Sequence, residues 1–576
     1  MGNVIMILFA QIMVKLLGLV YRMVITNIDG FGNSGNGFYN AGFQVYTVLL
    51  AISSVGIPNA IAKMVSERAA LGDYRSAHRI FVTAFKLFSV VGLVCAALLY
   101  IGSDFVAKYV VNMDGAQYVM RALAPSIFFV CVSSVIRGYF QGLSDMRATS
   151  FSQMLEQVFK CGLTIVLVVA AVGSMPAFMA VLTRLSMLYD MGRESVTPPE
   201  ILAAWANAAS SLATLISFLY LVHFYNRRKK GIYERISHST AAELTTSTRG
   251  LIRMILMLSV PISLASIITA VNRVVDLATI TRGIEAAFAS GIPARAGQAA
   301  IAHPTAVQLN REAVFLSGML SKSDTIFNMP LALNIAFATV LVPSIAGALA
   351  KGDTAEASSK TSYSFLISIF LILPCAIGFI TLAQPIYRII YPATPDGADL
   401  LAIMAVALIF SALTQTLTGA LQGIGKVFVP AIGILAGCVC KVALNIILIR
   451  MPSVNIYGAA ISSIACQLVA FLVNFLVLIR YIPLRITAGK YVVKPLASGA
   501  AMGIAAFGVY RAVSAVLGAG YVNNLIASAA AIAVAAVVYI GFVLRLHIMD
   551  KDDILLLPAG EKIYSLLVRW GIYKES

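Results

Sequence analysis

The sequence predicts an all-α polytopic membrane protein made of two pseudo-symmetric lobes. Three observations predict this fold: an apolar composition, apolar runs of about 20 residues that recur along the chain, and an internal repeat. The 576 residues are 60% hydrophobic and 12% charged, whereas an ordinary soluble domain is about 25% charged. The mean hydropathy is +0.89. This composition excludes a soluble enzyme, a secreted disulfide scaffold and a disordered chain, because so much apolar surface needs lipid as its solvent.

The apolar runs give 14 predicted transmembrane helices, each long enough to cross about 30 Å of hydrocarbon. They lie near residues 3–26, 39–64, 80–102, 119–142, 149–173, 201–225, 252–281, 313–349, 361–384, 399–424, 427–450, 456–480, 493–515 and 522–547. The first is interpreted as a span and not as a removable signal peptide, because no basic residue precedes Lys15 and no small-residue cleavage site follows.

Three segments are predicted to lie outside the spans. An outer loop at 174–200 holds a short interfacial helix, and residues 283–312 form an Ala-rich outer insertion. The tail 548–576 carries Tyr564, Trp570 and Lys574, which suit a helix at the headgroup level. The predicted organisation is an N-terminal lobe at 1–225, a basic cytoplasmic linker at 226–251, a C-terminal lobe at 252–480, two further helices at 481–547, and the tail.

The charge pattern predicts the orientation of the chain. The net charge is +17, and Lys and Arg concentrate in the links that follow even-numbered helices. Cytoplasmic loops carry such an excess, so both termini are predicted on the cytoplasmic side of the membrane. The strongest cluster is Arg227, Arg228, Lys229, Lys230 and Arg235. No stripe of basic and aromatic residues indicates nucleic acid. The seven cysteines lie in apolar runs without metal-type spacing and are predicted to be packing residues.

An internal repeat doubles the chain. The run "RGYFQGLSDM" begins at Arg137 and "TGALQGIGKV" begins at Thr418, and each ends one apolar helix and opens the next. The pairs Gly138/Gly419, Gln141/Gln422, Gly142/Gly423 and Lys160/Lys441 share one offset. A weaker pairing relates residues 56–73 to residues 341–353. Two related bundles facing each other are a transporter architecture.

Three stretches resemble a known family. They are "GNGFYNAGFQVYTVLLAISSVGIPNAIAKMVSERAALGDYRSAHRIF", "LAPSIFFVCVSSVIRGYFQGLSDMRATSFSQMLEQVFK" and the tail "LLLPAGEKIYSLL". The chain resembles the stage V sporulation protein B-like flippases of the multidrug/oligosaccharidyl-lipid/polysaccharide exporter superfamily, which includes the lipid II flippases. The resemblance implies 14 helices in two lobes around a central cavity. It also implies a lipid-linked, pyrophosphate-bearing saccharide as cargo, with lipid II as the leading candidate.

Ionisable side chains inside the spans are the candidate site residues, because each costs about 2.5–3.5 kcal/mol at mid-bilayer unless a partner, water or a ligand compensates it. Lys15 and Arg22 lie seven residues apart, on one face of the first helix. Arg273 lies on the seventh helix beside Asn272. We predict that Lys15, Arg22 and Arg273 line the cavity and bind pyrophosphate, and that Asn272 and Lys441 contribute to the same site.

The carboxylates leave two readings open. Asp276, Asp324 and Glu156 are candidates for Na⁺ or H⁺ coupling, which the sequence leaves undecided. Structural roles are the alternative: Asp276 pairs with Arg273, and Glu156 pairs with Lys160 at the i,i+4 spacing. In the resemblance, the segment "KSDTIFNMP" of the eighth helix departs from the family, because Thr325 stands where relatives have an arginine; Arg273 is the predicted replacement.

The same residues discriminate between the competing functions. A cation-coupled drug antiporter of the same superfamily needs carboxylates and aromatics in its cavity, whereas the candidates here are mostly cations. An exporter of another lipid-linked polysaccharide unit remains open. A glycosyl- or acyltransferase needs an acid/base pair, but the one acidic cluster, Asp550–Asp553, suits a solvated turn. The sequence therefore predicts a transporter without a cofactor or bound metal, monomeric, with membrane lipids and cell-wall synthesis proteins as partners.

Overall fold

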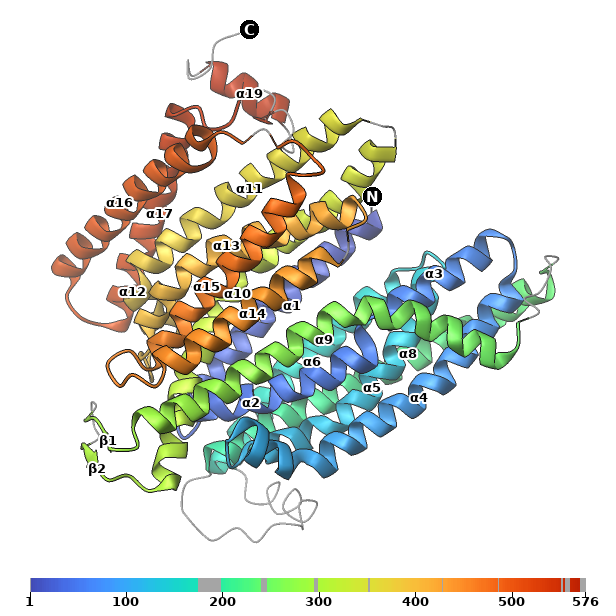
Figure 1. Cartoon of the computed structure of the whole chain (residues 1–576), viewed down its shortest axis with the longest axis horizontal. Coiled ribbons are helices and arrows are strands. Elements are labelled where there is room, and N and C mark those ends of the chain that lie inside the picture. Colours follow the sequence, from blue (N-terminus) through green and yellow to red (C-terminus); the bar gives the residue numbers. More distant parts are fainter. Residues whose placement is uncertain are drawn as a thin grey trace. The chain divides into compact units, whose positions relative to one another are not determined.

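The computed structural model describes residues 2–174, 198–239, 246–294, 299–350, 353–426, 428–484, 486–550, 553–554 and 560–569. Nearly all of these residues are helical (Figure 1). They form two compact units: unit 1 contains 1–322 and 442–458, and unit 2 contains 323–441 and 459–576. The predicted all-α polytopic fold is confirmed.

Unit 1 consists of long helices joined by short turns. They are α1 (Gly2–Thr26), α2 (Gly32–Leu50), α3 (Ile57–Ala70), α4 (Tyr74–Phe105), α5 (Ala116–Gly142), α6 (Arg147–Val169), α8 (Pro199–Ser237), α9 (Thr248–Ala287) and the first part of α10 (Ala306–Ala350). Three π-helical turns continue these helices: η1 (Ala51–Val55), η2 (Val106–Val111) and η3 (Ala170–Ser174). A short antiparallel pair, β1 (Gly291–Ile292) and β2 (Ile301–Ala302), separates α9 from α10.

Unit 2 contains the remainder of α10 and the C-terminal helices. They are α11 (Thr354–Thr381), α12 (Ala383–Ile390), α13 (Ala398–Gly423), α16 (Lys494–Leu517, preceded by η4, Gly489–Val493), α17 (Tyr521–Arg545) and α19 (Gly560–Arg569). Helices α14 (Val429–Leu448) and α15 (Ile456–Leu478) belong to unit 2 except for 442–458 at their junction.

Eleven of the helical segments in the described part of the chain are long and apolar enough to cross a membrane. They coincide with 11 of the 14 predicted spans. The other three predictions, at 3–26, 252–281 and 313–349, lie on α1, α9 and α10. The chain is therefore a multi-pass membrane protein, and the number of 14 spans stays a prediction.

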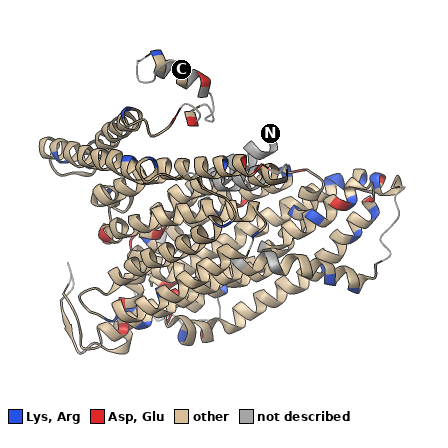
Figure 2. Ribbon diagram, turned by 45° about the horizontal axis from the view of Figure 1, so that its top comes forward, with Lys and Arg blue, Asp and Glu red and all other residues tan. Residues whose placement is uncertain are grey.

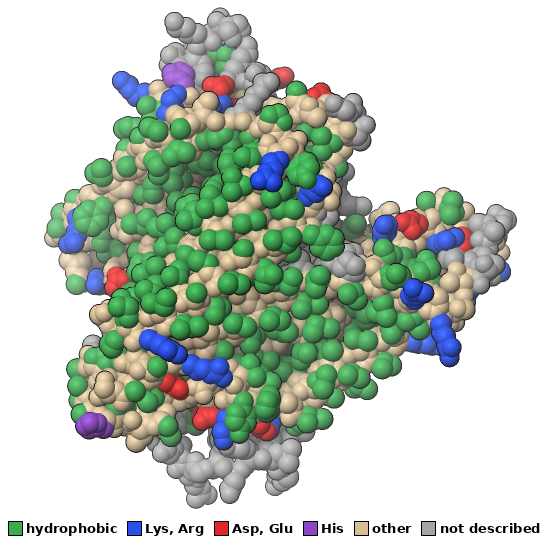
Figure 3. Space-filling model, viewed as in Figure 1, with side chains coloured by type: hydrophobic (Ala, Val, Ile, Leu, Met, Phe, Trp, Pro, Cys, Tyr) green, Lys and Arg blue, Asp and Glu red, His purple; other side chains and the backbone are tan. Residues whose placement is uncertain are grey.

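The molecule's outer surface is apolar, as a lipid environment requires. Large hydrophobic side chains stand fully outward along the spans, for example Val516 at 85%, Ile101 at 79% and Ile504 at 76% exposure. On the face drawn in Figure 3, hydrophobic side chains cover the middle of the helices. Lys and Arg gather instead at helix ends, as Figure 2 shows for unit 1. Burial of these side chains in lipid, not in a larger core, satisfies the apolar composition.

Helix α5 is the centre of unit 1. It packs against α2, α3, α4 and α8, and hydrophobic side chains on all of its faces are buried, among them Leu123, Ile127 and Val135. A helix that is apolar on every side is a buried helix. The elements around it are therefore positioned by α5.

The internal repeat is reproduced in the local geometry of the two units. After α5, the turn bonds Ser144 N–H to Gln141 O at 2.9 Å and Asp145 N–H to Phe140 O at 2.8 Å. After α13, the residues 281 positions later make the same bonds: Gly425 to Gln422 at 3.0 Å and Lys426 to Leu421 at 2.8 Å. Ser144 and Gly425 both have a left-handed backbone, with φ of 62° and 78°.

The weaker pairing is also reproduced. Asp73 accepts a hydrogen bond from Ser76 N–H at 2.9 Å and caps α4, and Asp353 accepts from Glu356 N–H at 2.8 Å and caps α11. Such N-caps satisfy backbone donors that a helix start leaves without partners. The repeat is therefore a feature of helix ends and caps, not a coincidence of apolar composition.

Some predicted segments differ in the structure. The first part of the predicted linker 226–251 is not a separate segment, because α8 continues without a break to Ser237. Lys and Arg are good helix formers and extend the helix beyond its apolar part. The predicted insertion 283–312 is shared by the end of α9, the β-pair and the start of α10. Helix α9 groups with unit 1, so the predicted lobe boundary at 252 is not a boundary of the compact units. The predicted loop helix at 174–200 lies almost wholly outside the described residues.

Helices α2 and α10 lie in close contact at Gly318, which gives a stability prediction. A Cβ at Gly318 would lie 1.7 Å from the carbonyl oxygen of Asn33, so no side chain fits without moving backbone. We expect Gly318→Ala to lower the melting temperature of the detergent-solubilised protein, with a cost of about 1–3 kcal/mol from overpacking. Gly347→Ala is the matched control, because nothing lies within 4 Å of its Cβ position. Equal melting temperatures for both variants would contradict the close approach.

Candidate functional site

The Arg22 guanidinium lies in a polar and aromatic setting inside unit 1. Its Nη1 donates to Asn36 Oδ1 at 2.8 Å, and Nη2 lies 3.5 Å from Ser321 Oγ. Its Cζ lies 4.0 Å from the ring centroid of Tyr39. Asn36 is itself held, because its Nδ2 donates to Thr26 Oγ1 and to Gly32 O, both at 2.9 Å. The arginine is therefore oriented by fixed partners, and none of these is a carboxylate.

Lys160 approaches the same aromatic group from α6. Its Nζ lies 5.4 Å from the ring centroids of both Tyr21 and Phe43. The hydroxyls of Tyr21 and Tyr39 are hydrogen-bonded at 3.0 Å, so a tyrosine pair connects the two cations. We call Arg22, Lys160, Tyr21, Tyr39 and Asn36 the cation cluster. It collects side chains from α1, α2 and α6, and these helices are positioned by contacts within unit 1.

The cation cluster concentrates positive charge without matching negative charge. Neither Arg22 nor Lys160 forms an ion pair with any carboxylate among the described residues. A contact with an aromatic face contributes about 0.5–2 kcal/mol, less than the about 2.5–3.5 kcal/mol that each cation costs at mid-bilayer. Such a cluster is chemically suited to hold an anion.

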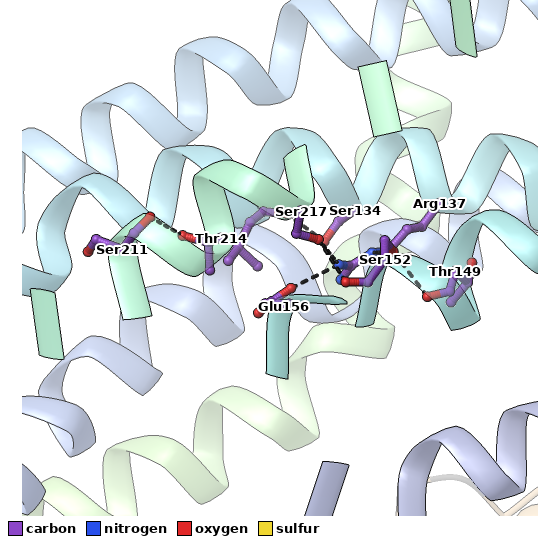
Figure 4. Close-up of polar contacts among 9 residues, drawn as sticks. Ser134, Arg137, Thr149, Ser152, Glu156, Ser211, Thr214 and Ser217 are labelled. Atoms are coloured by element: carbon purple, nitrogen blue, oxygen red, sulfur yellow. Dashed lines mark hydrogen bonds and ion pairs between the residues drawn. The ribbon is translucent and has the colours of Figure 1, made fainter. Parts of the chain in front are cut away.

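The predicted pair between Glu156 and Lys160 is wrong. Glu156 Oε2 is bound instead by Arg137 Nη2 at 2.9 Å, and Lys160 stands over the aromatic rings. Arg137 also donates from Nε to Ser152 at 2.9 Å and from Nη2 to Ser217 at 3.0 Å (Figure 4). Arginine offers several donors in a fixed fork, so it joins three helices, whereas the i,i+4 lysine supplies a single ammonium.

This Arg137 network makes Glu156 a structural residue of unit 1. The Arg137 side chain is 10% exposed and that of Glu156 28%. The network ties α5 to α6 and α8, and Ser217 Oγ donates onward to Ser152 O at 3.0 Å. No pattern in the sequence indicates this network, because Arg137 lies 19 positions from Glu156 and 80 positions from Ser217.

Asp276 lies in a second polar contact within unit 1. Asn445 Nδ2 donates to Asp276 Oδ1 at 2.7 Å and lies 3.1 Å from Thr279 Oγ1. The alternative pairing of Asp276 with Arg273 is not found; the Arg273 side chain is exposed and forms no ion pair with a described residue. Asn272 beside it is half-buried. The predicted roles of these residues toward a ligand stay predictions.

The remaining predicted residues are placed as follows. Asp324 on α10 and Lys441 on α14 are half-buried in unit 2, and both have interaction partners. The side chain of Lys15 lies outside the described part of the structure. The structure thus brings Arg22 and Lys160 to one tyrosine pair. It adds Tyr21, Tyr39 and Asn36, whose signal in the sequence was polar or aromatic side chains close to the link between the first two predicted spans.

Two known protein families match long parts of this chain. Residues 1–348 match the family described as polysaccharide biosynthesis protein, which is more than half of the chain. The chain belongs to that family. Residues 316–530 match the family described as lipid II flippase MurJ. The two matches confirm the resemblance to stage V sporulation protein B-like and lipid II flippase-like members of the exporter superfamily.

Individual relatives agree with the family assignment. The chain is 23% identical to the lipid II flippase MurJ of Bacillus subtilis (strain 168), over 81% of this chain and 80% of that protein. It is 22% identical to stage V sporulation protein B of the same organism, over 95% of this chain and 96% of the relative. These matches are to flippases and transporters, which confirms a transporter and not an enzyme.

Two solved structures share the fold. One is the lipid II flippase MurJ in an inward closed conformation, with a TM-score of 0.62 at 13% identity, covering 93% of this chain and 97% of that chain. The other is an inward-facing multidrug resistance MATE family transporter of the MOP superfamily, with a TM-score of 0.61 at 14% identity, covering 82% and 97%. At such identities these likenesses establish the architecture alone.

Proposed function

We propose that this protein is a flippase that moves an undecaprenyl-pyrophosphate-linked saccharide from the inner to the outer leaflet. Lipid II is the leading candidate for this cargo. The observation that carries the proposal is the cation cluster within a chain of this family. Its two cations have hydrogen-bonding and aromatic partners but no carboxylate among the described residues. Relatives whose names state lipid II flipping support the choice of cargo.

The chemistry of the cargo explains why cations are useful. A saccharide head does not cross hydrocarbon unaided, so the head travels in a polar cavity while the lipid tail stays in the bilayer. Arginine binds phosphate oxygens with two parallel N–H donors, and Asn36 and Tyr39 hold Arg22 in place for this contact. Lys160 adds a point charge beside the same tyrosine pair. A pyrophosphate then supplies the negative charge that this site lacks.

The proposed transport cycle is alternating access of two lobes. The cytoplasmic membrane is the proposed location, with both termini in the cytoplasm. A membrane potential that is negative inside favours outward movement of an anion by about 2.3 kcal/mol per charge per 100 mV. The cycle therefore needs no bound cofactor in this proposal. Arg273 and Lys441 are proposed to contact the cargo elsewhere on its path, and Asp276 and Asp324 to sense a coupling cation.

The decisive experiment measures the leaflet distribution of labelled lipid II in cells depleted of the protein. We expect lipid II to accumulate in the inner leaflet and to be lost from the outer surface. Reconstituted vesicles that contain the purified protein and fluorescent lipid II provide the direct test. Normal display of lipid II together with loss of another surface glycan would overturn lipid II as cargo. Unchanged display of every lipid-linked glycan would overturn the proposed function.

A substitution of Lys160 tests whether this residue contributes to cargo binding. We expect Lys160→Gln to slow vesicle transport by roughly tenfold or more, because a hydrogen bond to a charged group contributes about 1.5–3 kcal/mol and each 1.4 kcal/mol is about tenfold. Membrane levels should stay at those of the unaltered protein. Lys108→Gln is the matched control, since Lys108 is exposed on η2 and lies 5.7 Å from the Tyr109 ring. Equal rates for the two variants would remove Lys160 from the site.

A further inference from the structure

A pocket of about 530 Å³ lies at one end of unit 1, apart from the cation cluster. Its lining comes from the start of α4, the end of α5 with the turn that follows, the start of α6 and the distal part of α8. Its lining residues are Tyr74, Tyr139, Phe140, Leu143, Ser144, Asp145, Arg147, Arg227, Arg228, Gly231, Ile232 and Arg235. This is the end of unit 1 at which Lys and Arg gather in Figure 2.

The pocket is strongly basic. Four arginines face one aspartate in the lining, which gives a formal charge of 4 − 1 = +3. Asp145 is bound by Arg228 and lies 3.3 Å from Arg147 Nε, so its charge is already shared. Arg227 and Arg235 form no ion pair with any carboxylate in the part of the chain that the structure describes.

Two of the four arginines have partners that orient them beside the pocket. Arg228 bonds to Asp145, and its Cζ stands 4.7 Å from the ring centroid of Phe224. The Arg235 Cζ stands 5.9 Å from the ring centroid of Tyr74. Beneath them, Tyr139 and Phe140 are each 2% exposed and give the pocket an apolar floor. A guanidinium group that such contacts orient loses less conformational entropy when it binds an anion.

The side chains that line the pocket and its position at the helix ends indicate which ligand it binds. Guanidinium groups match phosphate oxygens in geometry and charge. Basic pockets between the ends of transmembrane helices bind phosphate-bearing lipid headgroups, and an apolar floor suits the first carbons of such a lipid. We propose that this pocket binds the phosphate group of an anionic membrane lipid, independently of the transported cargo.

If the positive charge at this helix end only set the orientation of the chain in the membrane, all of its basic side chains would be equivalent. Lys229 and Lys230 lie on the same helix and are exposed, yet they do not line the pocket. They provide a matched comparison of equal charge. Gly231 provides an independent one: it lines the pocket, and nothing lies within 4 Å of its Cβ position. A leucine there fills the pocket without removing a charge.

The test uses the purified full-length protein and native mass spectrometry with added dioleoyl-phosphatidylglycerol or dioleoyl-phosphatidylcholine. We expect selective retention of phosphatidylglycerol, reduced at least tenfold in the Arg227→Gln/Arg235→Gln variant and in Gly231→Leu. Lys229→Gln/Lys230→Gln should retain it at the level of the unaltered protein. Inorganic pyrophosphate is added in a parallel arm. Binding of pyrophosphate that depends on the same arginines, without lipid retention, would keep the phosphate site but assign it to a soluble anion.

Two outcomes would overturn the proposal. One is an equal loss of lipid from the lysine pair and the arginine pair, which indicates diffuse attraction. The other is full retention of both probes by Gly231→Leu, which places the anion outside the pocket. Membrane levels and melting temperatures of all variants are recorded alongside, so that a folding defect is separated from lost binding.

Discussion

Arg22→Gln is expected to slow vesicle transport of fluorescent lipid II by roughly tenfold or more while the protein stays folded in the membrane. The substitution removes the charge that Asn36, Ser321 and Tyr39 hold in place. A charge-assisted contact is worth about 1.5–3 kcal/mol, which predicts a loss of roughly 10- to 150-fold in cargo affinity. Glutamine still accepts and donates hydrogen bonds, so the local packing changes little.

Two further variants make this result specific. Arg22→Lys keeps the charge but loses the planar fork that pairs with phosphate, and we expect an intermediate rate. Arg511→Gln is the matched control, because Arg511 also stands over an aromatic ring, 5.2 Å from that of Phe507, but on the exposed side of α16. Transport by Arg22→Gln at the rate of Arg511→Gln would exclude Arg22 from the cargo site.

Arg137→Met is expected to cause the largest loss of stability among the proposed substitutions. It leaves the Glu156 carboxylate half-buried without its cation and removes the bonds to Ser152 and Ser217. Breaking a buried ion pair by removing one partner costs about 3–5 kcal/mol. The measurement is the melting temperature of the protein in detergent, together with its level in the membrane.

The surface pair between Arg121 and Asp104 is the control for this experiment. Its side chains are 34% and 63% exposed, and such pairs contribute about 0–1 kcal/mol, so Arg121→Met should change little. Arg137→Met/Glu156→Leu removes both charges and should recover part of the stability that the single variant loses. A single variant as stable as Arg121→Met would show that the Arg137 network is not a structural tie.

The positions of the helices were predictable because lipid surrounds the spans. In lipid, each backbone polar group needs an internal partner, so a run of about 20 apolar residues has to be helical. The repeat was predictable for a related reason. Gly425 in its turn and the capping aspartates Asp73 and Asp353 make local hydrogen bonds at helix ends, and these bonds leave a sequence signature.

The grouping of the polar side chains was not predictable from spacing. Glu156 and Lys160 are a favourable pair on an isolated helix, yet Arg137 from α5 offers Glu156 a fork of donors in a more buried place. Lys160 therefore does not pair with Glu156 and contacts the tyrosine pair beside Arg22. The result is a cluster whose members come from three helices.

The sequence by itself determined that this chain is a membrane-spanning, doubled bundle of helices with cations inside its spans, because hydropathy and helix caps act over a few neighbouring residues. Only the tertiary structure decided which cations have carboxylate partners. Arg137 has one, and Arg22 and Lys160 have none among the described residues. The physical reason is that an ion pair depends on distances of a few ångströms between helices that are far apart along the chain.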